Sequence, residues 1–238
     1  MINDKNLFFV LCVTLIVGCL IGMLMDNAVF FYPTNSFTEK RVSLAAVNEK
    51  GEGMAIPIVV EVKYGSGKVL TDIDKLLFWI DTQQSMQIAR DVAVNITKFD
   101  LSDYDLVYTI ETNETGIVGG PSAGAALAIA TIAALSNRTI RTDVMMTGTI
   151  NEDGTIGPVG GILEKAKAAR DIGAKIFIVP IGQGTELKLV PKESCIKTFG
   201  FLYCETKYQE ETIDIAKNSG IAIIEVKYIE DAAKYFFE

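Results

Sequence analysis

The segment from Pro121 to Leu135 most constrains how this chain can fold, because its composition predicts a helix with almost no polar side. Proline suits the first turn of a helix, and the residues that follow are mainly Ala, Ile and Leu. A helix that is apolar all round must be surrounded by protein, so we expect it at the centre of the fold. The 238 residues are 49% hydrophobic, which is enough for one domain with its own core.

Predicted strands and helices alternate on both sides of this central helix. The pattern predicts strands at 42–47, 55–64, 105–111, 144–150, 175–179 and 221–226, with helices at 85–97, 162–172, 210–218 and 229–236. A Gly-rich loop at 116–120 leads into the central helix. The alternation predicts the α/β fold class.

The N-terminus differs from the rest of the chain. Residues 7–25 carry no charge over 19 positions, and at about 1.5 Å per residue such a helix spans roughly the core of a bilayer. We expect an uncleaved membrane anchor at 1–26, a linker at 27–41 and a globular domain at 42–238. A cleaved signal peptide is the alternative, although no clear small-x-small cleavage site follows Met25.

Orientation rests on a few features. Lys5 precedes the uncharged stretch and the next basic residue is Lys40, so the positive-inside rule places the domain outside the cytoplasm. Cys195 and Cys204 lie in a late, loop-like stretch and could pair in an oxidising space. Weak glycosylation motifs begin at Asn95, Asn113 and Asn137. We therefore expect a single-pass protein of the cell membrane with an extracytoplasmic domain.

Composition and motifs also exclude some classes. The net charge is −8 and the isoelectric point about 4.8, so the chain lacks the basic surface of a nucleic-acid-binding protein. The turn at 65–68 lacks the spacing of a phosphate-binding Walker A loop. We expect no cofactor and no metal.

Ser122 opens the central helix after two glycines and a proline. Glycines let the backbone turn sharply, and the first turn of a helix presents N–H groups that could stabilise an oxyanion. The chain contains no histidine, so a Ser-His-Asp triad is excluded and lysine is the remaining candidate base. The alternative is that Ser122 merely caps the helix.

Lys165 lies on the predicted apolar side of the helix at 162–172. On a helical wheel, Ile162, Ala166, Ala169 and Ile172 define the buried stripe, and Lys165 falls inside it. Burial lowers the pKa of a lysine from its usual value of about 10.4 and can make it a general base. The alternative is a lysine that packs its stem and keeps its charge in water.

Several motifs together resemble the proteolytic domain of Lon proteases. The motifs are GPSAG at 120–124, MTG at 146–148, GPVGG at 157–161, GGILEK at 160–165 and AKIFIVP at 174–180. The resemblance is strong from 116 to 180 and weaker from 42 to 111. It implies a compact α/β domain related to one domain of ribosomal protein S5.

The resemblance also implies roles for three residues. Ser122 matches the nucleophile of the family, Lys165 its general base, and Thr147 a threonine whose hydroxyl helps to hold that lysine. Lon domains assemble as rings, so a homo-oligomer, a hexamer by resemblance, is implied. Lon proteins carry an ATP-driven unfolding module ahead of this domain. Here we expect only an anchor and a linker, and hence cleavage of peptides or unfolded proteins without ATP.

The chain departs from the Lon pattern at three places. Gly119 stands where many Lon sequences carry an acidic residue, and Thr149 where Glu is common. The stretch 183–218 is longer than its usual equivalent, with its two cysteines as a local staple. We therefore expect a membrane-anchored Lon-like serine endopeptidase. The alternatives are a non-catalytic peptide-binding or scaffold protein that retains the fold, and a structural envelope protein.

Overall fold

The computed structural model describes residues 38–237 except 73–75, 79, 112–115 and 119. The chain divides into two compact units, Met1–Asn35 and Ser36–Glu238, and the described residues belong to the second unit. The predicted anchor at 7–25 lies outside the described residues, as does most of the predicted linker. Among the residues that are described, no helix is both long enough and apolar enough to cross a membrane.

A four-stranded sheet forms one layer of the second unit. It consists of β1 (Thr38–Val47), β2 (Gly53–Tyr64), β5 (Tyr104–Ile110) and β3 (Val69–Thr71), in the order β1-β2-β5-β3. The first three strands are antiparallel and β3 runs parallel to β5. The strands predicted at 42–47, 55–64 and 105–111 are confirmed. They alternate buried and more exposed side chains, which gives the sheet one core face.

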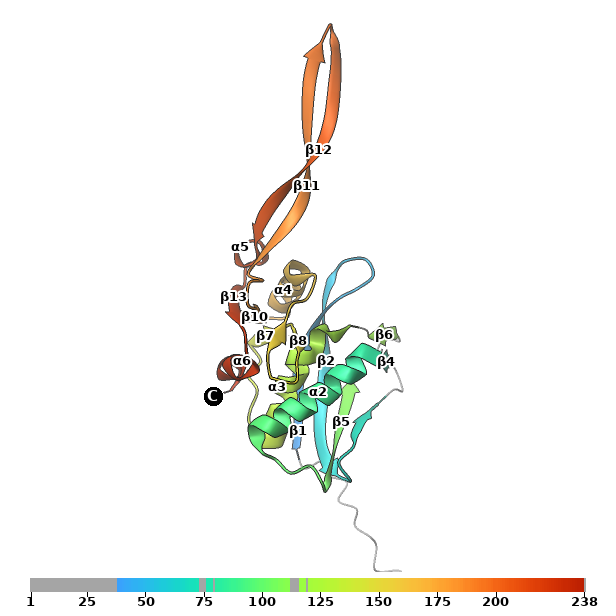
Figure 1. The fold of residues 1–238 in the computed structure, drawn as a ribbon, viewed down its shortest axis with the longest axis vertical. Coiled ribbons are helices and arrows are strands. Elements are labelled where there is room, and N and C mark those ends of the chain that lie inside the picture. The colour runs from blue at the N-terminus through green and yellow to red at the C-terminus, as the bar shows by residue number, and fades with distance from the viewer. Residues whose placement is uncertain (1–37, 73–75, 79, 112–115, 119, 238) are drawn as a thin grey trace, which may run out of the picture. The chain divides into compact units, whose positions relative to one another are not determined.

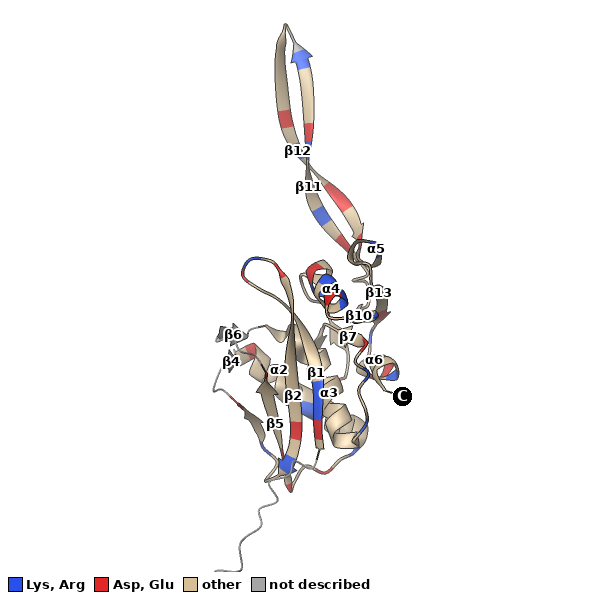
Figure 2. Ribbon diagram, turned by 180° about the vertical axis from the view of Figure 1, so that it is seen from behind, with Lys and Arg blue, Asp and Glu red and all other residues tan. Residues whose placement is uncertain are grey.

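Two helices pack on this sheet. They are α2 (Ile80–Thr97) and α3 (Gly124–Ser136), which follows a short 3-10 turn, η1 (Pro121–Ala123) (Figure 1). All residues of α3 except Ser136 are buried, so the predicted central helix is confirmed. It carries no charged residue, whereas α4 (Ile162–Asp171) bears several (Figure 2). The hydroxyls of Tyr108 and Thr131 lie 2.7 Å apart and join β5 to α3 inside the core.

A second, parallel sheet has the order β13-β10-β7. It contains β7 (Val144–Met146), β10 (Ile176–Pro180) and β13 (Ala222–Val226), accompanied by α4 (Ile162–Asp171), α5 (Ile215–Ser219) and α6 (Ile229–Phe236). The strand predicted at 144–150 is interrupted, because Gly148 has a φ of +151°. After it, β8 (Thr149–Ile150) turns away and pairs with β9 (Ile156–Gly157).

Two predictions about the remaining elements are wrong. Residues 116–118 of the predicted Gly-rich loop form β6 (Gly116–Val118), which pairs with β4 (Leu76–Phe78). Residues 210–214 of the predicted helix belong to a strand, because their backbones pair with residues 185–189. The helix begins only at Ile215, where the Asp214 carboxylate accepts the Lys217 N–H at 3.0 Å.

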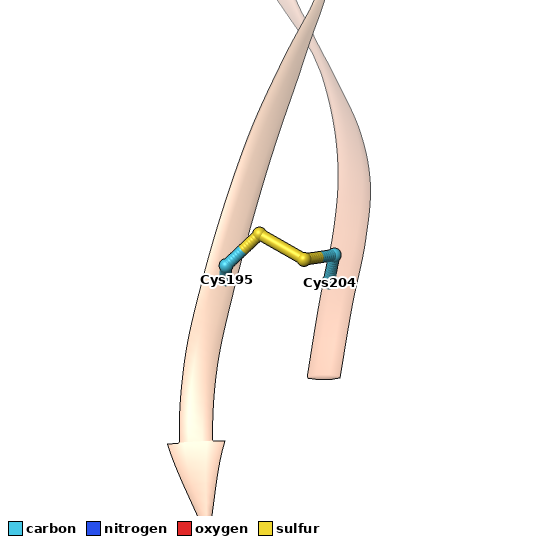
Figure 3. The surroundings of a disulfide bond; sticks show 2 residues. All are labelled: Cys195 and Cys204. Atoms are coloured by element: carbon cyan, nitrogen blue, oxygen red, sulfur yellow. A yellow bond between two sulfur atoms is a disulfide. The ribbon is translucent and has the colours of Figure 1, made fainter. Parts of the chain in front are cut away.

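The late, loop-like stretch is a long two-stranded hairpin, which we call the ribbon: β11 (Thr185–Thr198) and β12 (Phe201–Asp214). It extends away from the two sheets (Figure 1), and nearly all its described side chains are exposed. Phe199 and Gly200, with φ of 49° and 85°, form its two-residue turn. A disulfide joins Cys195 to Cys204 across the ribbon near this turn (Figure 3). The predicted local staple is therefore present.

Candidate active site

Three elements bring Ser122, Thr147 and Lys165 together. Ser122 lies in the 3-10 turn before α3, Thr147 follows the end of β7, and Lys165 lies in the first half of α4. Strand β7 packs beside α3, and the break at Gly148 turns the chain toward the start of α3. The three residues that the sequence predicts therefore occupy one place in the fold.

Ser122 is half-buried, and its backbone is fixed from the side of β7. Its carbonyl oxygen accepts the Gly148 N–H at 3.0 Å and the Thr147 hydroxyl at 3.2 Å. The residue before α3 is Ala123, and no side chain caps either this helix or η1. The alternative that Ser122 merely caps the helix is therefore wrong.

Lys165 is buried, with 4% of its surface exposed. Its Nζ donates a hydrogen bond to Thr147 Oγ1 at 3.3 Å, and no carboxylate of the described residues lies within ion-pair distance. Burial lowers the pKa of Lys165 from 10.5 to about 8, because the charged form loses its hydration. The alternative of a lysine that keeps its charge in water is therefore wrong.

Thr147 connects the other two residues. It is 1% exposed, and its hydroxyl accepts from Lys165 while donating to the Ser122 carbonyl. Among the described residues, no hydrogen bond joins Ser122 Oγ directly to Lys165 Nζ. The structure thus shows the predicted contact between Thr147 and the lysine, while a direct Ser122–Lys165 contact stays a prediction.

Two glycines set the position of α4. Gly161, with a φ of +66°, precedes the helix, and an added Cβ there would lie 2.8 Å from Val47 Cγ2. A Cβ at Gly53 would collide with the Glu164 carbonyl oxygen, so β2 and α4 approach closely. This packing turns Lys165 inward.

The predicted apolar stripe of α4 is mostly confirmed. Ile162, Ala166 and Ala169 are buried beside Lys165. Ile172 is 56% exposed, so its place in the stripe was wrong. The physical reason is that the helix ends at Asp171, so the helical wheel does not give the direction of the Ile172 side chain.

Other features of the site were less visible in the sequence. Gln183 bonds to the backbone of Val159, in the loop before α4, and its only local signal is the pair of flanking glycines. Thr149, one of the departures from the Lon pattern, is half-buried in β8, while Gly119 lies outside the described residues. No group of three or more metal-ligating side chains occurs in the described part of the chain.

Comparisons with known proteins point to one family. Residues 102–215 match the model of the Lon protease (S16) C-terminal proteolytic domain. Similar curated proteins include Lon protease 1 of Thermus thermophilus, 42% identical over 91 residues, which are 38% of this chain and 11% of that protein. The archaeal Lon protease of Thermococcus kodakarensis is 32% identical over 162 residues, 65% of this chain and 24% of that protein.

A third relative has the same character. The archaeal Lon protease of Pyrococcus abyssi is 32% identical over 159 residues, 63% of this chain and 15% of that protein. The chain therefore spans no more than about a quarter of the length of these relatives. The matched segment includes Ser122, Thr147 and Lys165.

Proposed function

We propose that this chain is a Lon-like serine endopeptidase in which Ser122 is the nucleophile and Lys165 the general base. The observation that carries the proposal is the buried Lys165 amine, which has no carboxylate of the described residues within ion-pair distance and is held by Thr147 beside the backbone of Ser122. The similarity of residues 102–215 to Lon proteolytic domains supports the same reading.

The proposed reaction has two halves. Neutral Lys165 Nζ takes the proton of Ser122 Oγ, which attacks the peptide carbonyl carbon and forms a tetrahedral oxyanion. The N–H groups of Ser122 and Ala123 are the donors that we assign to this oxyanion, because the first N–H groups of a helix have no intrahelical partner. Lys165 then gives the proton to the leaving amine, and the C–N bond breaks to leave an acyl-enzyme.

Water completes the cycle. Lys165 takes a proton from the water that attacks the ester carbon of the acyl-enzyme, and the proton returns to Ser122 Oγ as the C–O bond breaks. Thr147 holds the amine throughout and never exchanges a proton with the substrate. The enzyme ends in its starting state.

Substrates and setting are part of the proposal. We assign peptides or unfolded proteins as substrates and cleavage without ATP, because no step of the proposed hydrolysis consumes a nucleotide. We also assign a membrane anchor at 7–25, an extracytoplasmic domain and a homo-oligomeric ring. The uncharged N-terminal stretch supports the anchor, and the Cys195–Cys204 disulfide supports an oxidising compartment.

One observation favours the alternative of a non-catalytic peptide-binding protein. In the described residues Thr147 bonds to the Ser122 backbone carbonyl and to the Lys165 amine, and no hydrogen bond joins the Ser122 hydroxyl to that amine. Catalytic hydrogen bonds are often long or misaligned before substrate binds, so the endopeptidase stays the first proposal.

The deciding experiment is an assay of the full chain on a reduced, alkylated and unfolded protein without ATP, from pH 6 to 10. The Ser122→Ala and Lys165→Met variants are assayed in parallel under the same conditions. We expect cleavage that rises through about pH 8, as Lys165 loses its proton, and none in either variant. A folded parent that binds the unfolded protein without cutting it would establish the alternative.

A further inference from the structure

One amide side chain joins the root of the ribbon to the loop that precedes the lysine helix. Gln183 is half-buried, and its Oε1 accepts the Val159 N–H at 3.0 Å. Its Nε2 donates to the Val159 carbonyl oxygen at 2.8 Å. One side chain therefore satisfies both polar groups of one backbone residue, as a neighbouring strand would.

Gln183 is itself held firmly. The Glu225 carboxylate in β13 accepts the Gly182 N–H at 2.9 Å and the Gly184 N–H at 2.6 Å. The Gln183 N–H donates to the Pro180 carbonyl at the end of β10 at 3.1 Å. The amide thus projects from a loop fixed to two strands of the parallel sheet, at the point where the ribbon begins.

Val159 lies directly upstream of the proposed base. It follows the end of β9 at Gly157 and precedes α4, so it has no place in a ladder or a helix. Two residues later, the Gly161 carbonyl accepts the Lys165 N–H at 3.0 Å, the first hydrogen bond of α4. The loop that contains Val159 therefore leads directly into the turn of α4 that carries Lys165.

We propose that Gln183 is a positioning residue for Lys165, an inference that rests on the proposed function. Its two hydrogen bonds hold the loop at 158–161 against the root of the ribbon, so that α4 presents the Lys165 amine to Thr147 in a dry environment. Without them, the first turn of α4 loosens and water reaches the amine.

Charged side chains near Lys165 do not account for its lowered pKa, so Gln183 would act on that pKa by controlling the hydration of the amine. The elements that pack on α4 are β1, β2, β10 and α5. Their charged side chains are Glu39, Lys40 and Arg41 of β1, Glu61 and Lys63 of β2, and Lys217 of α5. None of these contributes to the lowered pKa of Lys165, whose cause is burial.

The first test compares Gln183→Met, which keeps the length of the side chain, with Gln209→Met on the exposed face of β12 as the matched control. With a short fluorogenic peptide at pH 7.5, we expect kcat to fall at least about tenfold in Gln183→Met with KM nearly unchanged. We expect the inflection of the pH profile to move above 8, with activity recovering near pH 10. Unchanged kcat and inflection, or the same effect in Gln209→Met, would overturn the proposal.

The second test needs no activity. Lys165→Met is introduced into the parent and into the Gln183→Met background, and the urea midpoints are measured at pH 7. If Gln183 keeps the amine dry, the gain in midpoint from Lys165→Met is smaller in the Gln183→Met background. Equal gains would overturn the inference. Should Gln183→Met fail to fold, Gln183→Glu replaces it, because it keeps the acceptor for the Val159 N–H.

The two tests separate the two proposals. If neither the parent nor Ser122→Ala cleaves any substrate, the proposed function fails, and the midpoint measurement still decides whether Gln183 positions Lys165. If the parent cleaves but Gln183→Met matches it in kcat, pH profile and midpoint gain, only the role of Gln183 fails.

Discussion

At the scale of single residues, the candidate site depends on a buried lysine whose amine donates a hydrogen bond to Thr147. An amine taken out of water without a counter-charge destabilises the fold in its protonated form. The burial that makes the protonated amine unfavourable also lowers the pKa of Lys165 to about 8, and this lowered pKa makes Lys165 a candidate base. Stability and reactivity are therefore linked at this residue.

This link predicts that Lys165→Met stabilises the protein while abolishing cleavage. The folded pKa lies below the unfolded value of 10.5, so between pH 8 and 10.5 the unfolded chain binds more protons and the stability of the parent rises with pH. The variant should gain up to about 3 kcal/mol at pH 7, and almost nothing at pH 10.5. Urea unfolding at several pH values measures the difference, with exposed Lys167→Met as the control. A gain that is constant with pH would contradict the prediction.

Thr147 offers a second prediction at this scale. Thr147→Val keeps the shape of the side chain but removes the acceptor for Lys165 Nζ and the donor to the Ser122 carbonyl. We expect kcat to fall by roughly tenfold or more, because the amine loses its hydrogen bond to the Thr147 hydroxyl. Thr147→Ser should retain most of the activity. Equal rates for the valine and serine variants would show that the hydroxyl does not hold the lysine.

At the scale of elements, the sequence predicted the features that a local residue pattern determines, such as which helix is central and which face of a helix is buried. The apolar composition of α3 placed it at the centre, and the wheel of α4 placed Lys165 inside. The strand predicted at 144–150 is interrupted at Gly148, which has a positive φ and lies so close to Ile156 that an added Cβ would collide with it. The contact of Gln183 with Val159 joins residues 24 apart, and the glycines that flank Gln183 do not indicate which residue it contacts.

The ribbon shows the same limit and supports a prediction. Its residues have mixed local preferences, and only the long-range pairing of β11 with β12 makes strands of them. Because its side chains are exposed, Phe199 at 98%, the ribbon contributes little to the core. We expect Cys195→Ser with Cys204→Ser to lower the main unfolding temperature by less than about 2 °C. Faster hydrogen exchange should be confined to β11 and β12, and a fall beyond about 5 °C would show that the ribbon belongs to the core.

At the scale of the whole molecule, the chain consists of two compact units. Residues Ser36–Glu238 contain both sheets and the candidate site, and the uncharged stretch at 7–25 belongs to the first unit. The core clusters of the described residues lie entirely within the second unit. If the first unit is the membrane anchor that we propose, the two units should be separable.

Removing residues 1–35 tests this division. We expect the shortened chain to keep the unfolding temperature of the parent within about 2 °C, because it retains every core residue of the described part of the chain. The parent should sediment with membranes and resist extraction by salt or alkali, since an apolar span of this length inserts almost irreversibly. The shortened chain should stay in the supernatant and cleave a short peptide at the same rate per active site as the parent.

If the parent were also found in the supernatant at its full mass, the predicted anchor would be wrong. A supernatant form that lacks the first residues would instead establish a cleaved signal peptide. Loss of peptide cleavage on truncation, with the fold intact, would show that the first unit contributes to the site or its assembly.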